Sequence, residues 1–200
     1  MTLLARSNHP GSQSSFINAA NQSVLVSGIP FAYRDLGPRT QFPLVMFNHW
    51  GAVLDNFDPR IIDGLAKKRR VITTDYRGIG GSGSAAPLTV GEMADDAIGF
   101  IHALGLDKVD LLGFSLGGFV AQDIALKAPE RVRRLIRPGT GPAGGTGIDN
   151  GGSVTWPLMI KGLLTLRDPK FYLFFTTTAN GQRAASEYLQ RLKERRQDRD

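Results

Sequence analysis

A serine between two glycines is the feature of this chain that most limits how it can fold. Residues 113–117 read Gly-Phe-Ser-Leu-Gly, after an apolar run at 109–112 and before a helix-like segment at 116–127. A G-x-S-x-G sequence between a strand and a helix is typical of a nucleophile elbow. Ser115 then lies at a strained bend with its hydroxyl exposed, and glycine two positions away on either side avoids collision. A glycine-rich loop that only turns the chain is the alternative, and the flanking strand and helix favour the elbow.

Apolar and amphipathic segments alternate along the rest of the chain. Asp58 before Pro59 marks one helix start, and Thr89 with Glu92 forms a capping box at another. The pattern predicts strands at 23–27, 31–36, 44–48, 70–75, 109–112 and 132–136, and helices at 59–68, 89–104 and 116–127. Two strands followed by repeated strand–helix alternation predict an α/β fold with a mostly parallel, doubly wound sheet.

Composition divides the chain into three parts. Residues 1–22 are rich in Ser, Asn and Gln and are predicted to be a flexible tail, and 23–140 form the α/β core. The third part, 141–200, begins with a glycine-rich linker. The glycine-rich stretch to which this linker belongs runs from 139 to 152. Helices are expected beyond it at 156–166, 170–176 and 184–196, with an apolar surface formed by Leu163, Leu166, Phe171, Phe174 and Phe175.

Composition also excludes several classes of protein. The chain has 200 residues, 42% hydrophobic and 21% charged, which suits one core, and it has no cysteine for disulfides, thiol catalysis or cysteine-held metals. The net charge of +6 comes largely from residues 131–137 and 183–199. In the second of these segments acidic residues are interleaved with the basic ones, which is typical of a solvated helix face. Nucleic acid is therefore not an expected partner. No apolar run could span a membrane, and Leu3-Leu4-Ala5 is too short for a signal peptide, so a cytoplasmic protein is expected.

A second glycine pattern, G-x-G-x-x-G at 78–83, resembles a dinucleotide-binding fingerprint. That fingerprint needs its last glycine in the opening of the helix and an acidic residue at the end of the next strand. Here Pro87 and Leu88 separate the glycines from the helix cap, and Asp107 and Asp110 flank the start of the next strand. We therefore expect no nicotinamide or flavin site, and the sequence offers no cofactor or metal site.

Several segments in the right order resemble the serine branch of the α/β-hydrolase superfamily, which includes esterases, cofactor-free haloperoxidases and aminopeptidase-like enzymes. They are 43–51 (PLVMFNHWG), 75–82 (DYRGIGGS) and the Ser115 elbow, and the resemblance covers about residues 22–150. It implies an α/β-hydrolase fold and hydrolysis of a small-molecule, ester-like acyl substrate by Ser115. It also implies that Asp75 is structural and that helices after the sixth strand form a cap over the active site. An ordinary helical packing layer is the alternative for these helices.

Such an enzyme needs an oxyanion hole opposite the nucleophile. Negative charge develops on the attacked carbonyl oxygen, and two backbone N–H groups stabilise it. Leu116, at the start of the helix, supplies one. In the resembled family the other comes from the loop after the third strand, where Trp50 matches the donor position. A shift by one residue would make the donor Gly51, and His49 stands where the family has glycine.

The catalytic base and acid are absent in the expected order. In this fold the order is Ser, Asp or Glu, His, whereas the three histidines, His9, His49 and His102, all precede Ser115. Only His49 could approach Ser115, from the wrong side for the family geometry. We therefore expect a C-terminally truncated hydrolase that lacks the last part of the sheet; the alternative is a catalytically silent binding protein of the same fold. The sequence leaves the substrate and the oligomeric state open.

Overall fold

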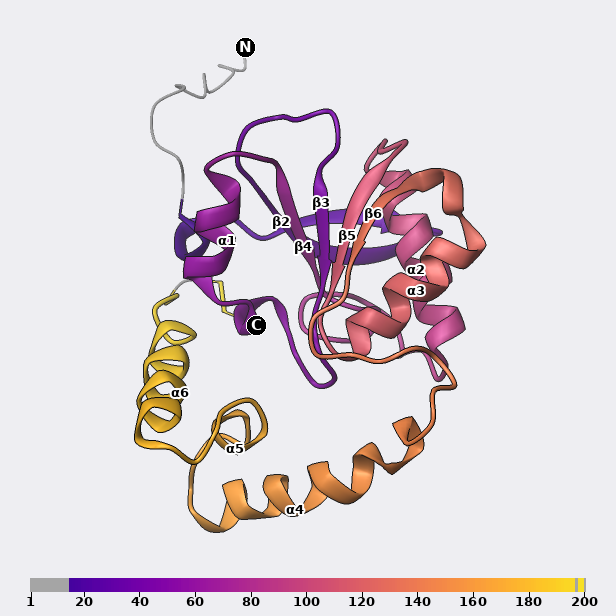
Figure 1. The fold of residues 1–200 in the computed structure, drawn as a ribbon. Coiled ribbons are helices and arrows are strands. Elements are labelled where there is room, and N and C mark those ends of the chain that lie inside the picture. The colour runs from indigo at the N-terminus through magenta and orange to yellow at the C-terminus, as the bar shows by residue number, and fades with distance from the viewer. Residues whose placement is uncertain (1–14, 197, 200) are drawn as a thin grey trace.

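A sheet of six strands forms the centre of the computed structural model, which describes residues 15–196 and 198–199 (Figure 1). The strand order is β1-β2-β4-β3-β5-β6. The β1–β2 and β2–β4 pairs are antiparallel, and β4–β3, β3–β5 and β5–β6 are parallel. The strands are β1 Gln22–Val26, β2 Ile29–Leu36, β3 Leu44–Phe47, β4 Val71–Thr74, β5 Val109–Gly113 and β6 Val132–Ile136. The predicted α/β class with a mostly parallel sheet is confirmed.

Helices cover both faces of this sheet. The α2 and α3 helices pack on one face, where Phe100 and Ile124 meet strand residues such as Val45, and α1 packs on the other through Ile62 (Figure 1). The helices are α1 Pro59–Ala66, α2 Val90–Ala103, α3 Leu116–Lys127, α4 Gly151–Leu164, α5 Lys170–Leu173 and α6 Ala179–Arg191. None of those described is long and apolar enough to cross a membrane. The cytoplasmic location stays a prediction.

The two predicted helix caps are confirmed. The Asp58 carboxylate accepts a hydrogen bond from the Arg60 N–H at 3.0 Å. At α2, the Glu92 N–H donates to the Thr89 hydroxyl at 3.2 Å, and the Thr89 N–H donates to the Glu92 carboxylate at 3.1 Å. Each cap satisfies backbone N–H groups that have no partner inside their helix, which is why these helices begin where the sequence indicates.

The predicted tail at 1–22 needs correction at its end. Residues 1–14 lie outside the described residues, but Phe16 is 2% exposed and begins a short 3₁₀ helix, Phe16–Asn18. The Ser15 hydroxyl and the Phe16 N–H each donate to the Asp63 carboxylate at 2.6 Å. A polar local composition predicted flexibility, whereas a distant carboxylate and the core hold this segment in place.

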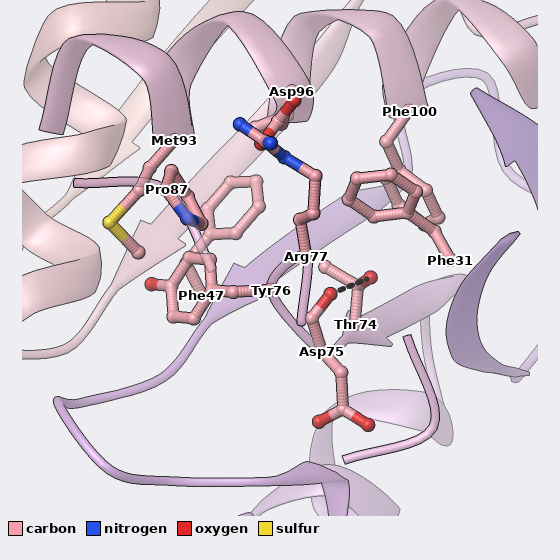
Figure 2. Close-up of a pocket in the computed structure, with 11 residues that line it drawn as sticks. Phe31, Phe47, Thr74, Asp75, Tyr76, Arg77, Pro87, Met93, Asp96 and Phe100 are labelled. Atoms are coloured by element: carbon pink, nitrogen blue, oxygen red, sulfur yellow. Dashed lines mark hydrogen bonds and ion pairs between the residues drawn. The ribbon is translucent and has the colours of Figure 1, made fainter. Parts of the chain in front are cut away.

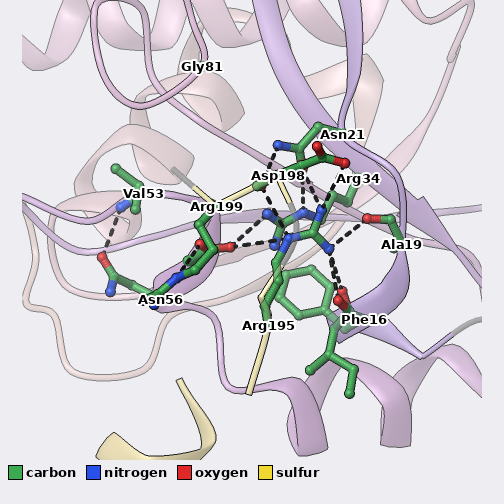
Figure 3. A network of polar contacts seen from close by, with 12 residues as sticks. Phe16, Ala19, Asn21, Arg34, Val53, Asn56, Gly81, Arg195, Asp198 and Arg199 are labelled. Atoms are coloured by element: carbon green, nitrogen blue, oxygen red, sulfur yellow. Dashed lines mark hydrogen bonds and ion pairs between the residues drawn. The ribbon is translucent and has the colours of Figure 1, made fainter. Parts of the chain in front are cut away.

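All three predicted C-terminal helices have different bounds, and α5 ends at Leu173 instead of residue 176. The α4 helix begins at Gly151, inside the predicted glycine-rich stretch, and α6 spans 179–191 instead of 184–196 because Thr178 caps its start through the Gly181 N–H. Arg195 follows the end of α6, and its guanidinium group donates to the carbonyls of Phe16, Ile17 and Ala19 (Figure 3). Arg195 is 5% exposed, so the two ends of the described chain share one buried polar cluster.

A buried carboxylate in β5 joins this strand to β6 and to the segment before β4. Asp110 is fully buried and accepts hydrogen bonds from Arg69 at 2.7 Å and from both the Nε and Nη2 atoms of Arg133, at 2.8 and 2.7 Å. Burial alone would raise the pKa of Asp110, but the hydrogen bonds from Arg133 and Arg69 outweigh it and hold this pKa below its ordinary value.

Replacing this carboxylate tests its contribution to stability. We expect Asp110→Asn to lower the free energy of unfolding by about 3 kcal/mol at pH 7, because two guanidinium groups lose their buried counter-charge. Urea titration measures the loss, and Asp107→Asn, at an exposed position on the preceding loop, is the matched control. Since the pKa is lowered by folding, the difference between Asp110→Asn and the parent should shrink as the pH falls through that pKa. Equal effects of the two variants would contradict this role.

Strand β6 lies at the edge of the sheet and pairs only with β5 among the described strands. Ile136 is 43% exposed there. Of the two arginines within β6, Arg133 is bound to Asp110 and stacks over the Phe42 ring at 4.4 Å, so its charge is paired within the fold and does not protect the strand edge. Arg134, which is exposed, is the other charge within β6, and a strand edge with so little free charge is a template for pairing with another strand.

We therefore expect the 200-residue chain to self-associate as its concentration rises. Ile136→Lys should reduce this association, since it places a charge on the free edge. Light scattering coupled to size-exclusion chromatography measures both chains, with Leu88→Lys, at an exposed leucine in the loop before α2, as the control. A chain that stays monomeric at high concentration would overturn this expectation.

Candidate functional site

Ser115 lies at the sharp turn between β5 and α3. Its backbone angles are φ 54° and ψ −115°, in a region that non-glycine residues rarely occupy. The Ser115 N–H donates to the Pro138 carbonyl at 3.2 Å, which ties the turn to the segment after β6. The strained bend that the sequence predicted is present, and the Ser115 side chain lines a cavity.

The glycines around Ser115 are required by close backbone contacts. A Cβ atom at Gly113 would collide with the backbone of Gly117, and one at Gly117 would collide with the Phe47 carbonyl. A Cβ atom at Gly118 would collide with the Thr140 side chain. The helix can therefore approach the sheet only with these residues reduced to backbone.

The loop after β3 is held by a single carbonyl oxygen. The Asn48 carbonyl accepts hydrogen bonds from the Gly117 N–H at 3.1 Å and from the Tyr76 hydroxyl at 2.9 Å. Burial raises the pKa of Tyr76, so its hydroxyl keeps the proton it donates. The Tyr76 ring stacks on Phe47 with centroids 6.3 Å apart (Figure 2). This clamp fixes the path of the loop that carries His49, Trp50 and Gly51.

Asp75 belongs to the turn after β4. Its carboxylate accepts the Gly81 N–H at 3.1 Å and lies directly against Gly80, where a Cβ atom would collide with it. Figure 2 shows this carboxylate below the small cavity that Tyr76, Met93 and neighbouring residues line. That cavity has a volume of only about 10 Å³, which is the size of one water molecule. The geometry agrees with a structural role for Asp75.

A larger cavity of about 600 Å³ lies over Ser115. Its core side brings together Ser115, Trp50 and Gly51, the last of which the sequence indicated as the alternative donor. Leu116 is the first residue of α3, so its N–H has no acceptor within the helix. The full lining is His49, Trp50, Gly51, Phe114, Ser115, Gly139, Thr155, Met159, Asp168, Pro169, Lys170, Leu173 and Phe174. Helices α4 and α5 thus supply the opposite wall, and the sequence singled out only Phe174 among its residues.

Three aromatic rings join this wall to the core. Phe174 packs edge-on against His49, with centroids 5.1 Å apart, and against Phe114, with centroids 5.3 Å apart. His49 and Phe114 also meet edge-on at 5.7 Å. One ring comes from the loop after β3, one from the turn before Ser115 and one from the end of α5, so the cluster holds the α4–α5 segment over the cavity.

The hydrogen bonding of His49 defines its protonation state. Its Nδ1 atom lies 2.8 Å from the Trp50 carbonyl, and because a carbonyl only accepts, Nδ1 carries the hydrogen. The Nε2 atom is buried and has no partner among the described residues. Burial lowers the pKa of His49 and is the largest effect; the hydrogen bond to Trp50 opposes it, and smaller effects of Lys170, which lowers the pKa, and Asp168, which raises it, follow. His49 is therefore neutral at pH 7.

This burial makes stability depend on pH. A histidine whose pKa is lowered by folding favours the folded state above its ordinary pKa of 6.5 and loses that contribution as the pH falls. We expect His49→Phe to weaken the loss of stability between pH 7 and pH 5, since a ring is kept and the titrating group is removed. Urea unfolding at each pH measures the loss. His102→Gln, at an exposed position, is the matched control; the same slope in all three chains would contradict this role of His49.

Comparison with known proteins defines the class. Residues 43–185, well over half of the chain, match the family model described as alpha/beta hydrolase fold. The chain belongs to this family. A solved alpha/beta hydrolase fold protein from Chitinophaga pinensis is 36% identical with a TM-score of 0.85, over 94% of this chain and 67% of that one.

Two curated relatives are enzymes of this class. Proline iminopeptidase PfmaB from Pestalotiopsis fici is 37% identical over 124 residues, which is 60% of this chain and 44% of that protein. The 2-hydroxymuconate semialdehyde hydrolase of Pseudomonas sp. strain CF600 is 34% identical over 123 residues, or 60% of this chain and 43% of that protein. The chain spans less than half the length of these two relatives. The resemblance to hydrolases that the sequence predicted is confirmed.

Proposed function

We propose that the protein carrying this sequence hydrolyses a small-molecule acyl compound through a Ser115 acyl-enzyme. The observation that supports this most is the strained backbone of Ser115 at the start of α3, on the floor of a cavity of about 600 Å³. Strain of this kind persists only where surrounding structure imposes it, and it concentrates at functional sites. The hydrolase relatives point to the same reaction class.

In this proposal the Ser115 Oγ attacks the acyl carbonyl carbon and its proton passes to a base. The carbonyl oxygen becomes an oxyanion, which accepts hydrogen bonds from the Leu116 N–H and from the Trp50 N–H, with Gly51 as the alternative second donor. The N-terminus of α3 adds a favourable dipole. The tetrahedral intermediate then expels the leaving group, and water releases the acyl group from Ser115.

The clamp on Asn48 gives this proposal its geometry. An oxyanion hole stabilises charge only if its donors are fixed before the reaction. Gly117 follows Leu116 in the first turn of α3, and its N–H donates to the Asn48 carbonyl in the loop that carries Trp50. The two proposed donor segments are therefore joined directly to each other.

The base is not assigned to His49. Its Nδ1 hydrogen is used by Trp50 and its Nε2 atom is covered, so we propose a wall position for this ring. The order that is typical of the family would place the acid and the histidine after Ser115 and after the cap. All three histidines of this sequence precede Ser115.

Replacing the nucleophile tests the proposal directly. In the active protein, Ser115→Ala should lower turnover of 4-nitrophenyl acetate by roughly a thousandfold or more, because no acyl-enzyme can form. Release of 4-nitrophenol measures turnover, and circular dichroism checks the fold. Ser23→Ala, at an exposed position of β1, is the matched control and should keep the parent rate. Turnover by Ser115→Ala within twofold of the parent would sink the proposal.

A second candidate, a binding protein that keeps the fold without the chemistry, is favoured by the position of the histidines before Ser115. A fluorophosphonate probe separates the two, because it reacts with an activated serine and not with an ordinary hydroxyl. Mass spectrometry that finds the probe on Ser115 supports the hydrolase. An unmodified Ser115, with 4-nitrophenyl acetate bound and not hydrolysed, supports the binding protein.

A further inference from the structure

The cavity wall above Ser115 is mainly apolar. Its large apolar side chains are Trp50, Phe114, Met159, Leu173 and Phe174, and they come from both the core and the α4–α5 segment. Its volume of about 600 Å³ is within the range of small-molecule sites. An acyl group bound here gives up its water for hydrocarbon and aromatic surface, so burial of apolar atoms stabilises it and burial of an unpaired charge does not.

Two charged side chains, Asp168 and Lys170, interrupt this wall. The Lys170 Nζ lies 3.1 and 3.3 Å from the two carboxylate oxygens of Asp168, and the Lys170 N–H donates to the same carboxylate at 2.9 Å. The pair sits at the start of α5, only two residues apart, so it forms within one turn of the chain. The cation of the wall is therefore already neutralised by its neighbour.

The two charges also oppose each other inside the cavity. At His49, on the far wall, Lys170 lowers the pKa whereas Asp168 raises it. A carboxylate on an incoming acyl group would meet a cation whose counter-ion is in place, beside a carboxylate that repels it. It would lose its hydration without gaining a free partner.

We propose that this site accepts uncharged, apolar acyl groups and that Asp168 excludes acyl groups that carry a carboxylate, by neutralising Lys170. The inference rests on the proposed function, since it concerns the acyl group that Ser115 would receive. It makes Asp168 a specificity-determining residue. Removal of its charge should convert the Lys170 side of the cavity into a site for anions.

Two esters of equal chain length test the charge preference. The 4-nitrophenyl ester of valerate ends in a methyl group, and the 4-nitrophenyl monoester of glutarate ends in a carboxylate at the same place. For the active protein, kcat/KM for the valerate ester should be at least about tenfold higher. An equal or higher value for the glutarate ester would overturn the inference.

Asp168→Asn tests the residue. This variant keeps an oxygen that can accept the Lys170 N–H but removes the charge, so the ratio of kcat/KM for the glutarate ester to that for the valerate ester should rise by about tenfold, mainly through KM. Added salt should reverse the rise because it screens the freed cation. Asp107→Asn, at an exposed position outside the cavity lining, should leave the ratio unchanged. A ratio that does not change in Asp168→Asn contradicts the role of Asp168.

A binding measurement separates this inference from the proposed function. The 4-nitroanilides of valerate and glutarate resist hydrolysis, and NMR shifts of the 200-residue chain carrying Ser115→Ala report their affinity. If neither ester is hydrolysed, the proposed function fails, and tighter binding of the valerate anilide by about tenfold or more still supports the charge preference. Equal or tighter binding of the glutarate anilide overturns it.

Discussion

The close approach of α3 to the ends of β3 and β5 is the constraint on which the rest of the structure depends. At Gly113 and Gly117 the two backbones meet with no room for a Cβ atom. This contact bends Ser115 into its strained conformation and brings the Gly117 N–H to the Asn48 carbonyl. The close contact of α3 with the strands therefore fixes both the position of Ser115 and the position of the loop after β3. A larger residue at either glycine would move both together.

The segment after β6 contacts this core both near the cavity and far from it. Near the cavity, Phe174 completes the three-ring cluster with His49 and Phe114. At the other end of the segment, Arg191 of α6 forms a two-pronged ion pair with Asp58, with Nη2 and Nε at 2.7 and 3.0 Å from one oxygen. The same Asp58 carboxylate caps α1, so one side chain both starts that helix and binds α6 to the core. The cavity over Ser115 thus has walls supported from both sides.

The buried cluster around Asp55 connects regions that no local pattern relates. Arg34 is fully buried and donates to the Asp55 carboxylate at 2.7 Å, while Arg195 reaches the backbone of residues 16–19 (Figure 3). Arg195 and Phe16 are 179 positions apart in the chain. The Arg195 Nη1 atom approaches all three carbonyls, and Nη2 donates to the Asn21 side-chain oxygen at 3.3 Å, so the separate donors of one guanidinium group serve several acceptors. That property allows one side chain to hold a whole segment.

Features that depend on neighbours in the chain were open to sequence analysis. The glycines around Ser115, the caps at Asp58 and Thr89 and the alternation of strands and helices each act within a few residues, so their patterns predicted the elbow, the helix starts and the class of fold. The motif segments also brought Ser115 and Trp50 to one cavity as expected. Local geometry determines such features because the forces behind them are backbone hydrogen bonds and steric limits.

Only the tertiary structure decided which distant groups meet. Phe16 lies in a polar stretch, and its burial depends on Asp63 and Arg195. The neutral state of His49 depends on its burial beneath Phe174, and the charge balance of the cavity depends on α5 facing Ser115. Burial and electrostatic pairing act through space, and the energy of a side chain there is set by partners that the surrounding sequence does not contain. The sequence by itself determined the fold class and the elbow; packing decided the walls, the charges and the shape of the cavity around it.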